Sequence, residues 1–242
     1  MTIIAFAGPS LTAADRAAHP DVDWRPPAEA GDMLRLRAAE GDVVCLIDGY
    51  FDHRPAVRHK EILLLLSRGV TVLGASSIGA LRAAEMHSLG MIGVGAIYLA
   101  FASGRLCADD EVALVHAPEE WDWKALSLPL VDCRANLHRA VRSRFISPDE
   151  AREALHTARS IHYADRDWQR LLGETSLSGP RQKAILDWVE AFGISQKRLD
   201  ALACVDAAKK GGVRRRRAPS MVRTSLLDAL ARECGLTPEE LS

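Results

Sequence analysis

The sequence lacks the long apolar runs that a membrane-spanning helix requires. Runs such as Ile62–Leu66 are far shorter than the roughly 20 apolar residues that cross a bilayer. The start of the chain, Met1–Ala7, also lacks the basic region, the long apolar run and the cleavage site of a signal peptide. These absences predict no membrane partner and a cytoplasmic location.

An excess of either charge is also missing. The chain carries 31 lysines and arginines against 32 aspartates and glutamates, which gives a formal net charge of -1. A dedicated nucleic-acid binder usually carries a strong positive excess. We therefore expect no nucleic-acid partner.

Cysteine is sparse and dispersed. The five cysteines form no CxxC pair and no cluster with histidine, which predicts reduced core thiols rather than disulfides or a zinc site. The acidic run Asp109–Glu111 offers oxygen ligands, but a solvated loop is the more frequent role of such a run. Neither GxGxxG after the first strand nor a GxxxxGKS/T loop is present. We predict no metal and no cofactor.

The first half of the chain alternates short apolar runs with helical patterns. Thr2–Ala7, Val43–Ile47 and Val70–Leu73 each read as a buried strand that ends in a turn of small or polar residues. Strands separated by helices imply βαβ units. The sequence therefore predicts an α/β fold, with a Rossmann-like, parallel-rich sheet.

Further elements follow from the same patterns. We expect helices over Ala28–Glu40, Pro55–Leu66 and Ile78–His87, a glycine-rich loop over Gly90–Gly95, and an edge strand over Glu111–His116.

The second half shows helical patterns and no convincing strand. Ser147 followed by Pro148 is a strong helix start, because Ser caps and Pro favours the first helical position. We predict an α/β core domain over residues 1–130 and a helical C-terminal region over residues 131–242, with a basic linker at residues 209–217. The further helices expected there are Ser178–Phe192, Ser195–Ala208 and Met221–Ala231.

Polar residues follow the three predicted strands. Ser10, Asp48 and the pair Ser76 and Ser77 lie in the turns at the carboxyl ends of these strands. Ligands of parallel sheets bind at these ends. We expect these four residues around one crevice, with His59 or Glu85 at its edge.

Ser77 also stands in an A-x-S-x-G pattern, Ala75–Gly79, between a strand and a helix. The nucleophile elbow of α/β hydrolases has G-x-S-x-G in the same context, and the helix N-terminus offers amide donors for an oxyanion. The first glycine is absent here. The alternative is that Ser76 or Ser77 caps the helix, which is the commoner role.

Charged residues cluster on the two helices that flank this turn. His59, Lys60 and Glu61 are consecutive, so they point in different directions around a helix. Arg82 and Glu85 are i,i+3 neighbours, and Glu85 borders an apolar stripe, where it needs a partner such as Arg82 or Lys60. An exposed, solvated face is the usual place of such residues.

These segments together resemble the core signature of the TfuA-like proteins, in order, over roughly the first half of the chain. Ile78, Arg58 and Ala108 depart from the pattern, which favours Met, an aromatic residue and an acid there. The segments that carry the resemblance are Gly8–Ser10, Asp48–Phe51, His59–Leu63, Gly74–Glu85, Gly90–Gly95 and Asp109–Ala113.

The resemblance implies partnership with a YcaO enzyme, which activates a peptide backbone amide with ATP during thioamide formation on ribosomal peptides. It implies that the protein supplies sulfur by hydrolysing the C-terminal thiocarboxylate of a ubiquitin-like sulfur-carrier protein. In such a hydrolase Ser76 or Ser77 would supply the nucleophile and His59 the base. Lys60 or Arg82 would hold the anionic thiocarboxylate, and Ser10, Asp48, Glu61 and Glu85 complete the predicted substrate-binding set.

Two other functions remain open. A non-catalytic adaptor or allosteric partner would recruit the carrier to YcaO, with its charged motifs at an interface. A nucleotide- or phosphate-binding enzyme would use the glycine-containing turns, although the usual motifs are missing. The run Arg214–Arg217 would draw a sulfur carrier with an acidic face by electrostatic steering, unless it is only a solvated linker.

Overall fold

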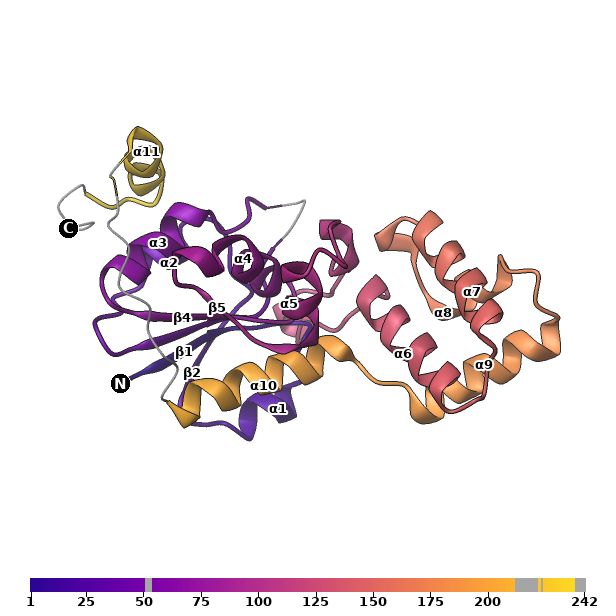
Figure 1. Ribbon diagram of the computed structural model, residues 1–242. Coiled ribbons are helices and arrows are strands. Elements are labelled where there is room, and N and C mark those ends of the chain that lie inside the picture. The colour runs from indigo at the N-terminus through magenta and orange to yellow at the C-terminus, as the bar shows by residue number, and fades with distance from the viewer. Residues whose placement is uncertain (51–53, 212–221, 223, 238–242) are drawn as a thin grey trace. The chain divides into compact units, whose positions relative to one another are not determined.

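The three predicted apolar runs form neighbouring strands of one parallel sheet (Figure 1). The computed structural model describes residues 1–50, 54–211, 222 and 224–237. The sheet has the order β2-β1-β3-β4-β5, and every pair of neighbours is parallel. This confirms the predicted fold class. The strands are β1 (Ile3–Phe6), β2 (Val22–Arg25), β3 (Val43–Leu46), β4 (Thr71–Gly74) and β5 (Ile92–Gly93).

The chain divides into two compact units. Residues 1–107 and 198–242 form the sheet unit, and residues 108–197 form the helical unit. The helices of the sheet unit are α1 (Ala13–Ala17), α2 (Asp32–Arg35), α3 (His59–Ser67), α4 (Ile78–Met86), α5 (Gly95–Ala102), most of α10 (Gln196–Lys210) and α11 (Ser225–Glu233). Those of the helical unit are α6 (Leu130–Arg142), α7 (Pro148–Ser160), α8 (Trp168–Gly173) and α9 (Gly179–Phe192).

Side chains alternate across the strands and build one core on each face of the sheet. Val44 and Leu46 of β3 pack with α3 and α4 on one face. Cys45 of the same strand packs on the other face, against Cys204 and Val205 of α10. Figure 1 shows α10 lying across the sheet on the side away from α3 and α4. A helix that begins 150 residues after the end of β3 therefore completes the sheet's core.

Several predicted elements differ in the structure. The strand β2 was not predicted, because Val22–Arg25 lies at the edge of the sheet and only Val22 is buried. The helix predicted over Ala28–Glu40 shrinks to α2. The predicted loop Gly90–Gly95 contains β5, and the helix expected from Pro55 begins only at His59.

The strand predicted over Glu111–His116 is wrong. Asp109–Glu111 forms a short 3-10 turn, and His116 contributes only an isolated bridge to Ala125. The reason is that the acidic side chains face arginines of the helical unit. Glu111 pairs with Arg134 at 2.6 Å.

The helical unit confirms the predicted helical character of the second half. No strand follows β5 in the part of the chain that the structure describes. Ser147 caps α7 as predicted, because its hydroxyl accepts from the Glu150 amide while the Glu150 carboxylate accepts from the Ser147 amide. The final predicted helix begins at Ser225. Met221, Phe51 and the basic run 214–217 lie outside the described residues.

None of the described helices combines the length and the apolar character that crossing a bilayer demands.

Candidate functional site

Three polar side chains meet where β1, β3 and β4 end. The Ser10 hydroxyl donates to Asp48 Oδ1 at 2.7 Å, and the Ser10 and Ser76 hydroxyl oxygens lie 2.7 Å apart. Three residues from the predicted crevice are therefore in direct contact, as the strand-end rule requires.

The hydrogen bonds that link Ser76, Ser10 and Asp48 all run in one direction. A serine hydroxyl has a single hydrogen, and an ionised carboxylate only accepts. Because Ser10 gives its hydrogen to Asp48, Ser76 must donate to Ser10. The order Ser76 to Ser10 to Asp48 is a path along which the Ser76 proton can leave.

The loop after β1 fixes Asp48 in place. Asp48 Oδ2 accepts from the Gly8 amide at 2.9 Å and from the Ser10 amide at 3.0 Å. The Gly8-Pro9-Ser10 turn thus wraps around the carboxylate that follows β3. Asp48 makes hydrogen bonds through both oxygens.

Ser76 has a left-handed backbone, with a φ of 65°. Residues other than glycine rarely adopt this conformation, and such strain gathers at functional turns. The turn is tight because two glycines approach neighbouring backbone. A Cβ on Gly79 would lie 1.7 Å from the Leu46 carbonyl oxygen, and one on Gly74 would lie 2.2 Å from the Gly79 carbonyl oxygen.

The cluster is closed to solvent. Ser76 is 0% exposed, Asp48 1% and Ser10 2%, whereas Ser77 reaches 9%. Ser77 is the residue that precedes α4, but its side chain does not cap the helix. The sequence offered both serines, with Ser77 in the A-x-S-x-G pattern, and the hydrogen bond to Ser10 belongs to Ser76.

His59, Arg82 and Glu85 form a second group, on α3 and α4. Glu85 Oε2 lies 2.8 Å from His59 Nε2 and 2.6 Å from an Arg82 nitrogen. Arg82 also donates to the Val57 carbonyl. Glu85 follows Ser77 by eight residues, which is about 12 Å along a helix. The predicted base His59 therefore pairs with Glu85, while the hydrogen-bond partner of Ser76 among the described residues is Ser10.

Lys60 and His59 border a small cavity next to this group. The cavity has a volume of about 260 Å³, and its wall includes His59, Lys60 and Arg82 together with leucines of α11, among them Leu226 and Leu230. Lys60 Nζ lies 3.4 Å from the Val222 carbonyl oxygen. The cavity is cationic on the side of α3 and apolar on the side of α11.

Glu61 belongs to neither group and is completely buried. Its carboxylate accepts from the Gly31 amide at 2.7 Å and from the Arg58 amide at 3.0 Å. Burial raises the pKa of Glu61 to about 7, although these amide hydrogen bonds oppose the rise. Glu61 therefore joins the start of α3 to the start of α2. No pattern of residue types marks these two hydrogen bonds, because the donors are backbone amides.

Two side chains of the acidic run pair with arginines. Glu111 binds Arg134 through two hydrogen bonds, and Asp110 lies 3.7 Å from Arg166. Within the described residues, no group of three or more histidine, cysteine or acidic side chains is arranged to hold a metal ion.

The fold and the site define a class of protein: a parallel α/β protein with a buried serine–serine–aspartate chain at the carboxyl edge of its sheet. Residues 48–167 match the family model described as TfuA-like protein, and over these residues the chain belongs to the TfuA-like family. The match includes Asp48, Ser76 and the His59 group, and it confirms the resemblance seen in the sequence. No curated protein matches the chain.

Proposed function

We propose that the chain supplies sulfur to a YcaO enzyme in the cytoplasm by hydrolysing the thiocarboxylate of a ubiquitin-like sulfur carrier. Membership of the TfuA-like family is consistent with a YcaO-associated role. The observation that supports the hydrolase proposal is the strained Ser76. Its hydroxyl is hydrogen-bonded to Ser10, which is hydrogen-bonded to Asp48.

The reaction follows the order of these hydrogen bonds. Ser76 Oγ attacks the thiocarboxylate carbon, while its proton passes to Ser10 and the Ser10 proton passes to Asp48. As the carbon–sulfur bond breaks, the proton held by Asp48 passes to the departing sulfur, so hydrosulfide leaves and an ester to Ser76 remains. Water then attacks the ester: one of its protons returns to Ser76 Oγ, its OH stays on the carrier, and the carboxylic acid so formed ionises. The sum is thiocarboxylate plus water giving carboxylate, hydrosulfide and a proton.

The cationic cavity supplies the matching contact for the carrier. Acidic side chains of the carrier outside its terminus would be the matching anions, because Lys60 and Arg82 border a hollow beside the exposed His59. In this proposal the His59 group binds the carrier and Ser76 performs the chemistry. The steering role of Arg214–Arg217 stays a prediction, because that run lies outside the described residues.

The test is sulfide release from a thiocarboxylated carrier, measured for the protein alone and with YcaO. Two variants separate the hydroxyl from the backbone strain. Ser76→Gly removes the hydroxyl and tolerates a φ of 65°, whereas Ser76→Ala removes it and keeps the strain. Catalysis by Ser76 predicts that both variants lose release at least about 100-fold, while Ser76→Gly unfolds no earlier than the wild type.

The adaptor is the second candidate, and the burial of the serine cluster favours it. Ser76 has no exposed surface, so a carrier reaches it only if the site opens. If sulfide appears only with YcaO and Ser76→Gly leaves that release unchanged, the cluster is structural and the chain is an adaptor.

A further inference from the structure

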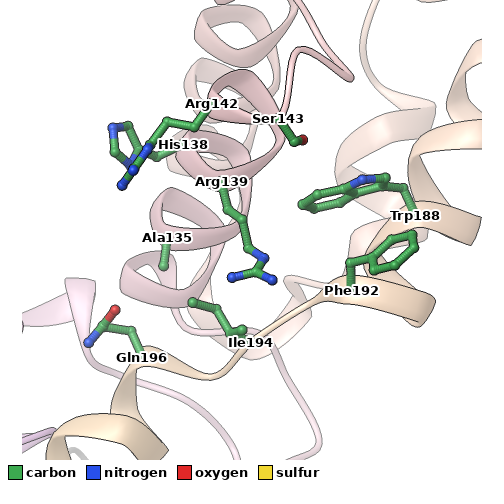
Figure 2. Close-up of a pocket in the computed structure, with 9 residues that line it drawn as sticks. All are labelled: Ala135, His138, Arg139, Arg142, Ser143, Trp188, Phe192, Ile194 and Gln196. Atoms are coloured by element: carbon green, nitrogen blue, oxygen red, sulfur yellow. The ribbon is translucent and has the colours of Figure 1, made fainter.

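The helical unit carries a hollow that the proposed chemistry does not use. It lies between α6 and the C-terminal part of α9 and has a volume of about 670 Å³, within the range of ordinary binding pockets. Figure 2 shows Arg139 extending from α6 toward Ile194. The rings of Trp188 and Phe192 lie on the α9 side of the hollow, and His138 and Arg142 lie on the α6 side.

The two arginines that line this hollow form no ion pair among the described residues. Other arginines of the helical unit bind carboxylates, as Arg134 does with Glu111 and Arg181 with Glu150. In the described part of the chain, neither Arg139 nor Arg142 meets a carboxylate. Like charges three residues apart on a helix repel each other. Their place in the last turn of α6 offsets part of this repulsion through the helix dipole.

The opposite wall is aromatic. Trp188 stacks on Phe145 with ring centres 5.6 Å apart and meets Phe192 at 5.8 Å with the rings tilted by 46°. Phe192 is nevertheless 56% exposed. An exposed aromatic ring beside unpaired cations is typical of a site for a ligand that is both anionic and apolar.

We propose that this hollow binds an acidic peptide segment of a partner protein. Carboxylates of the segment pair with Arg139 and Arg142, because planar guanidinium groups suit carboxylates. An apolar side chain of the segment covers Phe192 and the exposed edge of Trp188. The residues that line this hollow include none of the serine cluster and none of the cavity of the His59 group.

A peptide fits better than a nucleic acid. One face of Trp188 is covered by Phe145, and Phe192 is tilted by 46° to Trp188, so a base cannot stack flat on both of these rings at once. The chain as a whole is near neutral, so it offers no long-range attraction to a polyanion.

The probe is a fluorescein-labelled eight-residue peptide of alternating glutamate and leucine, titrated with the full chain and followed by fluorescence anisotropy. We expect binding that weakens as salt rises and a double variant, Arg139→Ala with Arg142→Ala, that binds at least tenfold more weakly. Replacement of both arginines by lysine keeps the charges and should restore part of the affinity. Phe192→Ser should also weaken binding.

Matched controls come from the same unit. Arg159 is an exposed arginine in the last turn of α7, and Trp121 is an exposed ring, 72% accessible, outside the hollow. Arg159→Ala and Trp121→Ser should bind the peptide as the wild type does. Melting temperatures of all variants identify any that are misfolded.

Three results would overturn the proposal. The first is that the acidic peptide does not bind at low salt. The second is that the double arginine variant binds the peptide as well as Arg159→Ala does. The third is that an eight-nucleotide single strand binds more tightly than the peptide. Binding is measured without sulfide chemistry, so its failure leaves the hydrolase proposal untouched.

Discussion

The carboxyl edge of the sheet and the hollow of the helical unit use polar side chains in opposite ways. At the sheet edge Ser10, Asp48 and Ser76 are buried and bonded to one another. In the hollow Arg139 and Arg142 are exposed and meet no carboxylate of the described chain. A buried polar group without a hydrogen bond is costly, so it is paired within the fold. An exposed polar group is hydrated and remains available to bind another molecule.

The two proposals therefore rest on two kinds of observation. At the sheet edge the signal is a strained, fully paired cluster, whose residues also hold three strand ends together. In the hollow the signal is the lack of pairing itself. Mutations should therefore affect folding strongly in the first region and weakly in the second.

The largest expected effect is that of Gly79→Ala in the sheet unit. Its Cβ would lie 1.7 Å from the Leu46 carbonyl oxygen, which is backbone and cannot turn away. We expect a loss of about 3 kcal/mol or more of unfolding free energy, measured by chemical denaturation.

The control is Gly173→Ala at the end of α8, where a Cβ meets nothing within 4 Å. We expect that change to be neutral or to stabilise by up to about 1 kcal/mol. Equal effects of the two substitutions would contradict the difference in packing between the regions.

The next effect is the response of the sheet unit to pH through Glu61. Its folded pKa of about 7 lies above the ordinary 4.5. The contribution of this group is therefore fully present below pH 4.5 and is lost as pH rises through 7. The loss is roughly 3 kcal/mol. Hydrogen exchange of the β3 amides, measured from pH 5 to 8 and corrected for intrinsic rates, reports it.

Glu61→Gln cannot titrate, so its stability should not fall over this pH range. Glu119→Gln, an exposed site of the helical unit, removes the same charge and should keep the wild-type slope. A wild-type slope in Glu61→Gln would show that another group is responsible.

The helical unit should respond to pH with the opposite sign. Hydrogen bonds from Arg181, followed by the Ser147 amide, hold the pKa of Glu150 at about 2. The stabilisation is present above pH 4.5 and is lost as pH falls toward 2. The pair is partly exposed, so solvent screening reduces the effect to the order of 1 kcal/mol.

Tryptophan fluorescence measures this effect, because four of the five tryptophans belong to the helical unit, namely Trp121, Trp123, Trp168 and Trp188. Arg181→Gln should be less stable than the wild type at pH 6, and the difference should shrink to less than half of that value at pH 3. A constant difference at both pH values would mean that Arg181 acts through packing on Phe145 rather than through Glu150.

The smallest effect is expected in the hollow. Replacement of Arg139 and Arg142 by alanine removes a favourable interaction with the helix dipole and an unfavourable interaction between like charges. The effects of these two losses on the free energy of unfolding nearly cancel. Unfolding free energy should change by less than about 0.5 kcal/mol. A loss of 2 kcal/mol or more would show that these arginines serve the fold, and the contrast between the two regions would fail.

Much of the sheet edge follows from the sequence. Apolar runs that end in polar turns and alternate with helices specify parallel strands, and parallel strands place their carboxyl ends at one edge. That rule alone brought Ser10, Asp48 and Ser76 together. The start of α7 was equally predictable, because a capping box is a local pattern.

What lay beyond the sequence depends on contacts between distant segments. The choice between Ser76 and Ser77 came from the φ of 65° and from a hydrogen bond to a residue 66 positions away. Glu61 is held by backbone amides, which every residue carries, so no residue type marks its partners. The strand Glu111–His116 failed because Arg134, in another element, binds the acid that opens it.

The sequence by itself therefore determined the periodicity of the elements, the parallel sheet and the family signature, since these depend on neighbours along the chain. Only the tertiary structure decided that Ser76 rather than Ser77 joins the buried cluster, that His59 pairs with Glu85, and that α10 closes one face of the sheet. The physical reason is that hydrogen bonds and packing depend on distance in space, and the chain folds residues far apart in sequence to within a few ångströms of each other.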